Sequence, residues 1–244
     1  MSDFYVNQRL SLKMDLPTAR EAVLAIFDRV RKEFPRMDRF ERASGELALE
    51  SSQEDEHPLW VSLRKTSLRS GVVNPTNPKE AYRLHRLVLE TAPYFLSISP
   101  LDVDCVELVY GFDMAAGGNH DAIVFEALYG QGESHPLASL MSLPGATPSN
   151  VQPMLAMTLE GPEPVEAFFE VKTRNERGPR SPSAEGEGVI SVYLTLRRVG
   201  SVRQIDDLLT IQTALAETGE EIVRTRVVPN LLMPIRQAIA SSSS

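Results

Sequence analysis

Two stretches of alternating polarity, residues 4–15 and residues 101–114, constrain the fold of this chain more than any other feature. In the first stretch Phe4, Val6 and Leu10 share one parity, and polar side chains occupy the other. This alternation is typical of a β-strand with one buried and one solvated face. Both stretches carry an apolar residue followed by aspartate near their ends, and both lead into a helix-like segment. The restart of the pattern predicts two tandem α+β units.

The first unit is expected to span residues 1–100 and the second residues 101–240, with residues 241–244 as a tail. Their elements follow a β-α-β-β(-β)-α order, with a longer helix at the end of the second unit. Strands with one polar face predict a mostly antiparallel, curved sheet with helices on one face, and hence the α+β class. Residues 175–188 are charged and rich in Gly, Pro and Ser, which predicts a mobile loop.

Local signals predict several boundaries inside the units. Residues 45–50 and 58–69 are expected to pair as one hairpin. Pro93 is expected to kink or end the helix of the first unit, because proline has no backbone N–H. A long helix is predicted over residues 201–227, and Pro229 is expected to break it.

This order of elements is similar in topology to the TATA-binding-protein-like and helix-grip groups of folds, in which a sheet wraps around a long helix or a ligand. The resemblance covers the order of elements and includes no motif. It therefore implies an architecture and no activity. The two units share only a few sequence identities, so the prediction of an internal duplication depends mainly on the order of elements.

Charge and cysteine content exclude several classes of protein. The formal net charge is −8, so the surface as a whole would repel a phosphate backbone, which argues against nucleic acid as a partner. Cys105 is the only cysteine, which excludes an intramolecular disulfide and favours a cytoplasmic setting. The N-terminus has no signal-peptide pattern, and no apolar run reaches the roughly 18 residues of a membrane span. We expect a cytoplasmic protein with no membrane partner.

No motif for catalysis, a cofactor or a metal stands out. The four histidines show no metal-ligand spacing, and neither HExxH, CxxC nor GxSxG occurs. Residues 117–121, GGNHD, lack the spacing of a phosphate-binding loop and predict a turn with a helix cap. His85 is expected at the boundary or surface of its helix, and Cys105 in a shielded strand. We expect no cofactor, no metal and no catalytic residue, so an enzyme is the less favoured class.

The polar parity of the last two strands is the leading candidate for a binding surface. If residues 165–174 and 189–198 form a hairpin, their polar side chains lie in adjacent rows. Arg9 and Lys13 belong to a similar row in the first unit, and the two rows are expected to be continuous. The candidate binding residues are Trp60, Arg64, Phe168, Glu170, Lys172, Arg174, Tyr193 and Arg197.

Aromatic and arginine side chains are enriched at protein interfaces. The leading hypothesis is therefore a non-enzymatic binding protein whose open sheet face contacts a protein partner or a second copy of the chain. One alternative is a solvated face with cross-strand ion pairs. The other is a small-molecule-binding protein or enzyme with a cavity between the sheet and the long C-terminal helix, and such a cavity would be lined by convergent polar groups.

Overall fold

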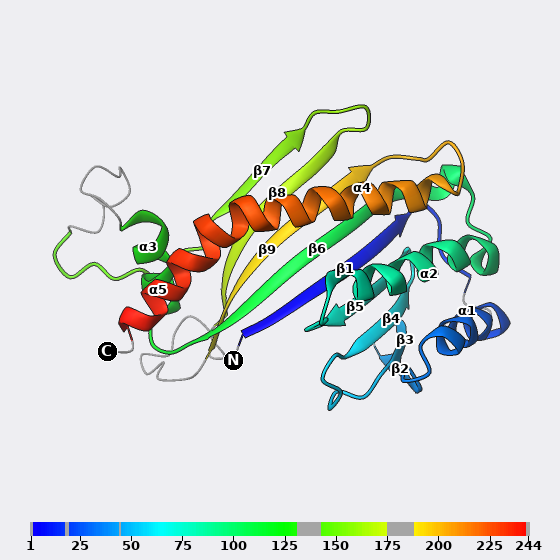
Figure 1. The fold of residues 1–244 in the computed structure, drawn as a ribbon, viewed down its shortest axis with the longest axis horizontal. Coiled ribbons are helices and arrows are strands. Elements are labelled where there is room, and N and C mark those ends of the chain that lie inside the picture. The colour runs from blue at the N-terminus through cyan, green and yellow to red at the C-terminus, as the bar shows by residue number, and fades with distance from the viewer. Residues whose placement is uncertain (1, 18–19, 44, 131–142, 175–187, 243–244) are drawn as a thin grey trace.

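The structure is a computed structural model, and it describes residues 2–17, 20–43, 45–130, 143–174 and 188–242 (Figure 1). They fold into a mixed arrangement of helices and one large sheet, which confirms the α+β class. In chain order the elements are β1 (Ser2–Leu12), α1 (Arg20–Glu33), β2 (Arg39–Ala43), β3 (Glu46–Glu50), β4 (Leu59–Arg64), β5 (Ser67–Val73), α2 (Pro78–Leu96), the 3-10 helix η1 (Pro100–Asp102), β6 (Val103–Ala116), α3 (His120–Tyr129), β7 (Met154–Leu159), β8 (Val165–Arg174), β9 (Gly188–Val199), α4 (Asp207–Ile222), the π-helix η3 (Val223–Leu232) and α5 (Met233–Ser242).

The nine strands form one open, curved sheet in the order β2-β3-β4-β5-β1-β6-β9-β8-β7. Every neighbouring pair is antiparallel. β1 and β6 lie side by side at the centre, and outward from each of them the strands follow the reverse of chain order. The two units therefore contribute to a single sheet with a repeated topology, and the predicted division between them falls in η1. The duplication itself stays a prediction.

Helices α2 and α4 lie on one face of this sheet (Figure 1). The strand residues of one parity point at them, and Leu10, Leu108 and Leu194 are at most 1% exposed. The apolar faces of the helices complete the core, for example with Leu84 and Leu208, which are fully buried. Burial of this apolar area is the main favourable contribution to folding.

Tyr110 of β6 joins the sheet to both helices. Its hydroxyl lies 2.7 Å from the hydroxyl of Tyr82 in α2 and donates to the carbonyl oxygen of Ala216 in α4, at 3.1 Å. α4 can approach so closely because Gly219 has no side chain: a Cβ at this position would lie 2.3 Å from a ring carbon of Tyr110. The ring thus sets the distance between α4 and the sheet.

The hairpin predicted from residues 45–50 and 58–69 is wrong in its second arm. The chain reverses at Lys65 and Thr66, so this arm is the two strands β4 and β5. The reversal was missed because its two central residues are neither glycine nor proline, the usual turn signals. Strand β2 was also missed, and the first unit has four strands after α1.

The prediction that Pro229 breaks the long helix is wrong. Helical conformation runs without interruption from Asp207 to Ser242, and Pro229 lies in η3. In a π-helix the backbone bonds reach back five residues, as from the Met233 N–H to the Val228 carbonyl. This wider turn accommodates the missing N–H and the bulk of a proline ring. α2 likewise continues three residues past Pro93, to Leu96.

His85 is fully buried, and its predicted place at the boundary or surface is wrong. Its Nδ1 lies 2.8 Å from the hydroxyl oxygen of Ser70 in β5, and its carbonyl oxygen accepts a hydrogen bond from Gln8. The Ser70 hydroxyl satisfies one ring nitrogen of His85, whose ring lies on the core face of α2. Residues 175–187 of the predicted mobile loop lie outside the described residues, and Ser241 and Ser242 of the expected tail belong to α5.

Candidate functional site

The face of the sheet opposite α2 and α4 carries none of the described helices (Figure 1). In β1 the residues Val6, Gln8 and Leu10 face the helices and are buried. The intervening residues, which include Tyr5 and Arg9, face the other side and are half-buried. We refer to this second side as the open face. Its residues can meet a binding partner without any rearrangement of the fold.

A row of charged side chains crosses the open face at right angles to the strands. Strand register places one residue from each of six consecutive strands opposite the next. The row is formed by Ser62, Arg69, Arg9, Glu107, Arg197 and Glu166. The row crosses the β1–β6 junction, and it contains Arg9 and Arg197 from the two rows expected from the sequence.

Arg197 is held in place within this row. Its Nε and Nη2 atoms donate to Oε2 of Glu107, at 3.0 and 2.7 Å, and Glu166 lies 4.0 Å away. Its guanidinium group also lies 4.9 Å above the ring centre of Phe168. The carboxylate of Glu107 raises the pKa of Arg197, against the effect of burial. A charged group fixed in this way loses little conformational freedom when a partner binds.

Aromatic rings lie flat on the open face beside the charged row. Trp60 stands directly opposite Gly71, and a Cβ on this glycine would lie 2.4 Å from the indole ring. Tyr5 stands opposite Gly111 in the same way, with a corresponding distance of 2.1 Å. Each ring therefore covers a glycine of the neighbouring strand. Tyr193 extends this group, since its ring centre lies 6.3 Å from that of Tyr5.

The predicted hairpin of the last two strands is confirmed by the pairing of β8 with β9. Glu170 is opposite Tyr193, and Lys172 is opposite Ser191, with its Nζ 3.0 Å from Glu170 and 5.5 Å from the ring centre of Tyr193. Arg174 lies in the same strand, β8, opposite Val189. The structure thus brings the second-unit candidates together on two adjacent strands.

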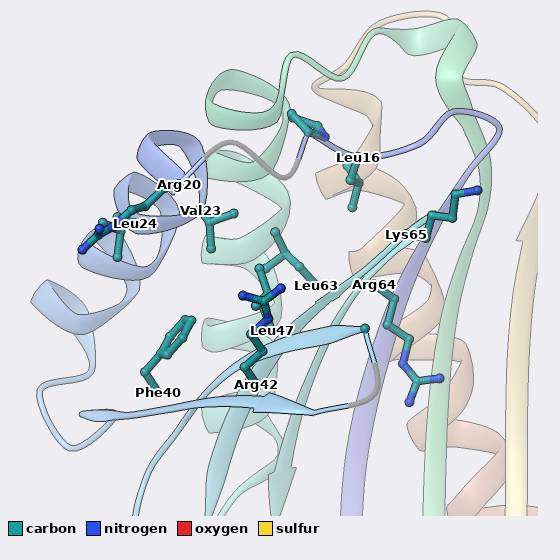
Figure 2. Close-up of a pocket in the computed structure, with 12 residues that line it drawn as sticks. Leu16, Arg20, Val23, Leu24, Phe40, Arg42, Leu47, Leu63, Arg64 and Lys65 are labelled. Atoms are coloured by element: carbon teal, nitrogen blue, oxygen red, sulfur yellow. The ribbon is translucent and has the colours of Figure 1, made fainter.

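The first-unit candidates lie on the same face. The guanidinium group of Arg64 lies apart from the apolar side chains labelled in Figure 2, and it pairs with Glu46 at 2.6 Å. Lys13 follows the end of β1 and donates to the hydroxyl oxygen of Ser201, so it does not belong to the charged row. The alternative interpretation, a face with cross-strand ion pairs, is therefore correct for Arg64 and Arg197.

Several residues of the open face were not among the predicted candidates: Tyr5, Ser62, Arg69, Glu107 and Glu166. Arg69 was placed at the end of a single long strand, whereas it lies inside β5 and faces Arg9 of β1. The alternation of Ser67, Arg69 and Gly71 with buried Leu68 and Val72 was the local signal that could have found it. The partners of these residues come from distant parts of the chain, and periodicity carries no information about them.

The cavity predicted between the sheet and the long helix is represented by a recess of about 460 Å³ beside α4. Its carboxylates, Glu217, Glu220 and Glu221, are exposed to solvent. A pocket of about 860 Å³ lies elsewhere, between α1 and the strands β2, β3 and β4 (Figure 2). Leucine, valine and phenylalanine account for half of its lining residues, and its basic lining residues are Arg20, Arg42, Arg64 and Lys65. The recess beside α4 is open to solvent and the larger pocket lies elsewhere, so the enclosed cavity between sheet and long helix that the small-molecule alternative names stays a prediction.

Cys105 is buried in β6, and burial raises the pKa of its thiol to about 12. The thiol is therefore protonated at neutral pH and unreactive. Among the residues that the structure describes, no cluster of His, Cys, Asp and Glu could hold a metal ion. None of the helices in the described ranges combines the length and the hydropathy that a membrane span requires.

Fold and surface together define an α+β protein with an open, curved antiparallel sheet that presents aromatic and charged side chains on its uncovered face. The sequence matches no protein-family model and no curated protein. Its function is therefore inferred from the geometry of the chain itself.

Proposed function

We propose that this protein is a non-enzymatic binding protein and that its open face binds a partner protein. The observation that supports this proposal most directly is the placement of flat aromatic rings beside an aligned row of arginines on a sheet face without a described helix. Trp, Tyr and Arg are the side chains that contribute most to protein interfaces. Here all three occur on adjacent strands of one surface.

The rigidity of this surface also supports binding. Trp60 and Tyr5 rest on glycines, and Arg197 is fixed by Glu107 and Phe168. Ordering a side chain at an interface costs about 0.5–1.5 kcal/mol, and side chains that are already ordered avoid much of this cost. A partner would therefore meet a surface that is organised before it binds.

Removing an aromatic ring from the open face is expected to weaken binding without unfolding the sheet. The variants Trp60→Ala and Phe168→Ala should each raise the Kd of the partner about 30-fold, the effect of losing about 2 kcal/mol at an interface hot spot. The matched control is Phe40→Ala, because Phe40 is 51% exposed and lies on the helix side of the sheet. Circular dichroism checks that all three variants fold.

The measurement starts with the tagged protein and its three variants in a lysate of the native host, followed by quantitative mass spectrometry. The partner is the protein that the wild type and Phe40→Ala retain and that Trp60→Ala and Phe168→Ala lose. Its Kd is then measured with purified proteins by calorimetry. If no retained protein is lost from both open-face variants, the open face is not the binding surface.

A second copy of the chain is another candidate partner, and the edge strand β7 favours it. Met154, Leu155 and Met157 are 65%, 58% and 41% exposed, and β7 carries no charge. The opposite edge, β2, carries Arg39, Glu41 and Arg42, the kind of residues that protect natural edge strands from unwanted pairing. Two neutral β7 edges could pair antiparallel and extend the sheet across a two-fold axis.

Placing a charge on the β7 edge is expected to prevent this pairing. Size-exclusion chromatography with light scattering should give the mass of two chains for the wild type and the mass of one chain for Leu155→Lys. The reason is that a lysine buried between the two β7 strands would have no partner for its charge. Phe40→Lys on the β2 edge is the matched control and should keep the wild-type mass. A wild-type protein that stays monomeric at high micromolar concentration would show that β7 is not a self-association edge.

A further inference from the structure

Arg9 and Arg69 stand directly opposite each other on the central strands β1 and β5. Both side chains are half-buried on the open face. In the part of the chain that the structure describes, neither forms an ion pair, and the Nε atom of each is buried without a hydrogen-bond partner. Like charges directly opposite on a sheet destabilise it, and Glu107, which stands opposite Arg9 on β6, forms its ion pair with Arg197.

The nearby carboxylates are already engaged. Glu46 pairs with Arg64 at 2.6 Å, and Glu107 receives two hydrogen bonds from Arg197. Burial and the positive charges of Arg64 and Arg9 lower the pKa of the Arg69 guanidinium, even though Glu46 and Glu107 oppose the effect. The positive charge of the Arg9–Arg69 pair is thus compensated only in part, by carboxylates that are paired with other arginines.

Ser62 adds a third polar group to this pair. It stands opposite Arg69 on β4 and is 1% exposed, and against the effect of burial its hydroxyl acts with Arg64 to lower the pKa of the Glu46 carboxyl. Two guanidinium groups can only donate, and a hydroxyl can donate as well. One acceptor with several oxygen atoms would bind the solvent-accessible N–H groups of both half-buried guanidinium side chains at once.

We propose that Arg9, Arg69 and Ser62 form a receptor site for an oxyanion, a carboxylate or phosphate group, carried by the protein that binds the open face. Paired guanidinium groups match the planar or tetrahedral arrangement of such oxygens with parallel N–H donors. The identity of the anion's carrier rests on the proposed function, whereas the anion site can be tested without the partner. Trp60 lies in the adjacent row of the same face, two residues from Ser62 on β4, and can report on binding.

The test uses inorganic phosphate and malonate as probes, with sodium chloride of matched ionic strength as the reference. Both thermal melting and the fluorescence of Trp60, the only tryptophan, are recorded. For the wild type, at least one probe is expected to raise the melting temperature above the chloride reference and to change the emission. Arg9→Gln and Arg69→Gln are expected to lose both responses and to melt above the wild type in probe-free buffer, because each removes the repulsion between like charges.

Arg29→Gln is the matched control, since Arg29 is an exposed arginine on α1 paired with Glu33, and it should respond to the probes like the wild type. A response to phosphate alone identifies a phosphorylated group as the natural anion, and a response to malonate alone identifies a carboxylate. A wild type without any response, or glutamine variants that respond fully, would overturn the receptor site. If the anion probes fail to bind but Trp60→Ala and Phe168→Ala still lose the partner, only the receptor site is wrong and the proposed function stands. If the probes bind but these two variants keep the partner, only the proposed function is wrong.

Discussion

Truncation of Tyr110 to alanine is expected to lower the free energy of unfolding by about 3–5 kcal/mol, the range for removing a buried aromatic ring. Tyr110 is 1% exposed and is among the largest fully buried side chains of the described residues. Its ring separates α4 from the sheet at Gly219, so its loss leaves a cavity that the rigid helix cannot close. Two further groups, the hydroxyl of Tyr82 and the carbonyl of Ala216, lose their partner.

Chemical denaturation followed by circular dichroism measures this effect. The control is Tyr110→Phe, which keeps the ring and removes only the hydroxyl, and its expected cost is about 1–2 kcal/mol because two hydrogen bonds, to the Tyr82 hydroxyl and the Ala216 carbonyl, are lost. The dependence of the unfolding free energy on denaturant should stay unchanged in both variants. If Tyr110→Ala costs no more than Tyr110→Phe, the ring does not hold α4 against the sheet.

Lowering the pH from 7 to 4 is expected to reduce the free energy of unfolding by about 3 kcal/mol through the protonation of His85 alone. Burial lowers the pKa of His85 from 6.5 to about 3 in the folded chain. Between these two values the unfolded chain binds a proton at His85 and the folded chain does not. The contribution of His85 to the free energy of unfolding is therefore fully present above pH 6.5. It decreases as the pH is lowered from 6.5 to 3, and it stays constant below about pH 3.

The double variant Ser70→Ala/His85→Leu isolates this contribution, because it removes both partners of the buried hydrogen bond and the titrating ring together. Its unfolding free energy should fall less steeply than that of the wild type between pH 6.5 and pH 4, where carboxylates contribute equally to both proteins. His57→Gln serves as control, since His57 lies in a loop and is only partly buried, and it should keep the wild-type slope. Equal slopes in the wild type and the double variant would show that His85 is protonated in the folded protein.

The candidate site was predictable to the extent that it depends on local alternation. Phe168, Glu170, Tyr193 and Arg197 follow from the period of two in their own strands, which fixes the face of each side chain once one face is buried. Their joint position needed only the short-range pairing of β8 with β9. The pair Arg9 and Arg69 could not be predicted in this way, because sixty residues separate its members and only the β1–β5 register makes them neighbours.

By itself, the sequence determined the α+β class and most of the strands with one buried face, because these depend on periodicity within each segment. The tertiary structure decided which strands are neighbours, where the rows of the open face meet, and which polar residues the core accepts. His85 is buried because Ser70 and Gln8 lie within hydrogen-bonding distance, and the helix passes Pro229 because its turn widens to a π-helix. Such outcomes depend on contacts between distant segments, and packing energies there outweigh the local preferences that a sequence pattern records.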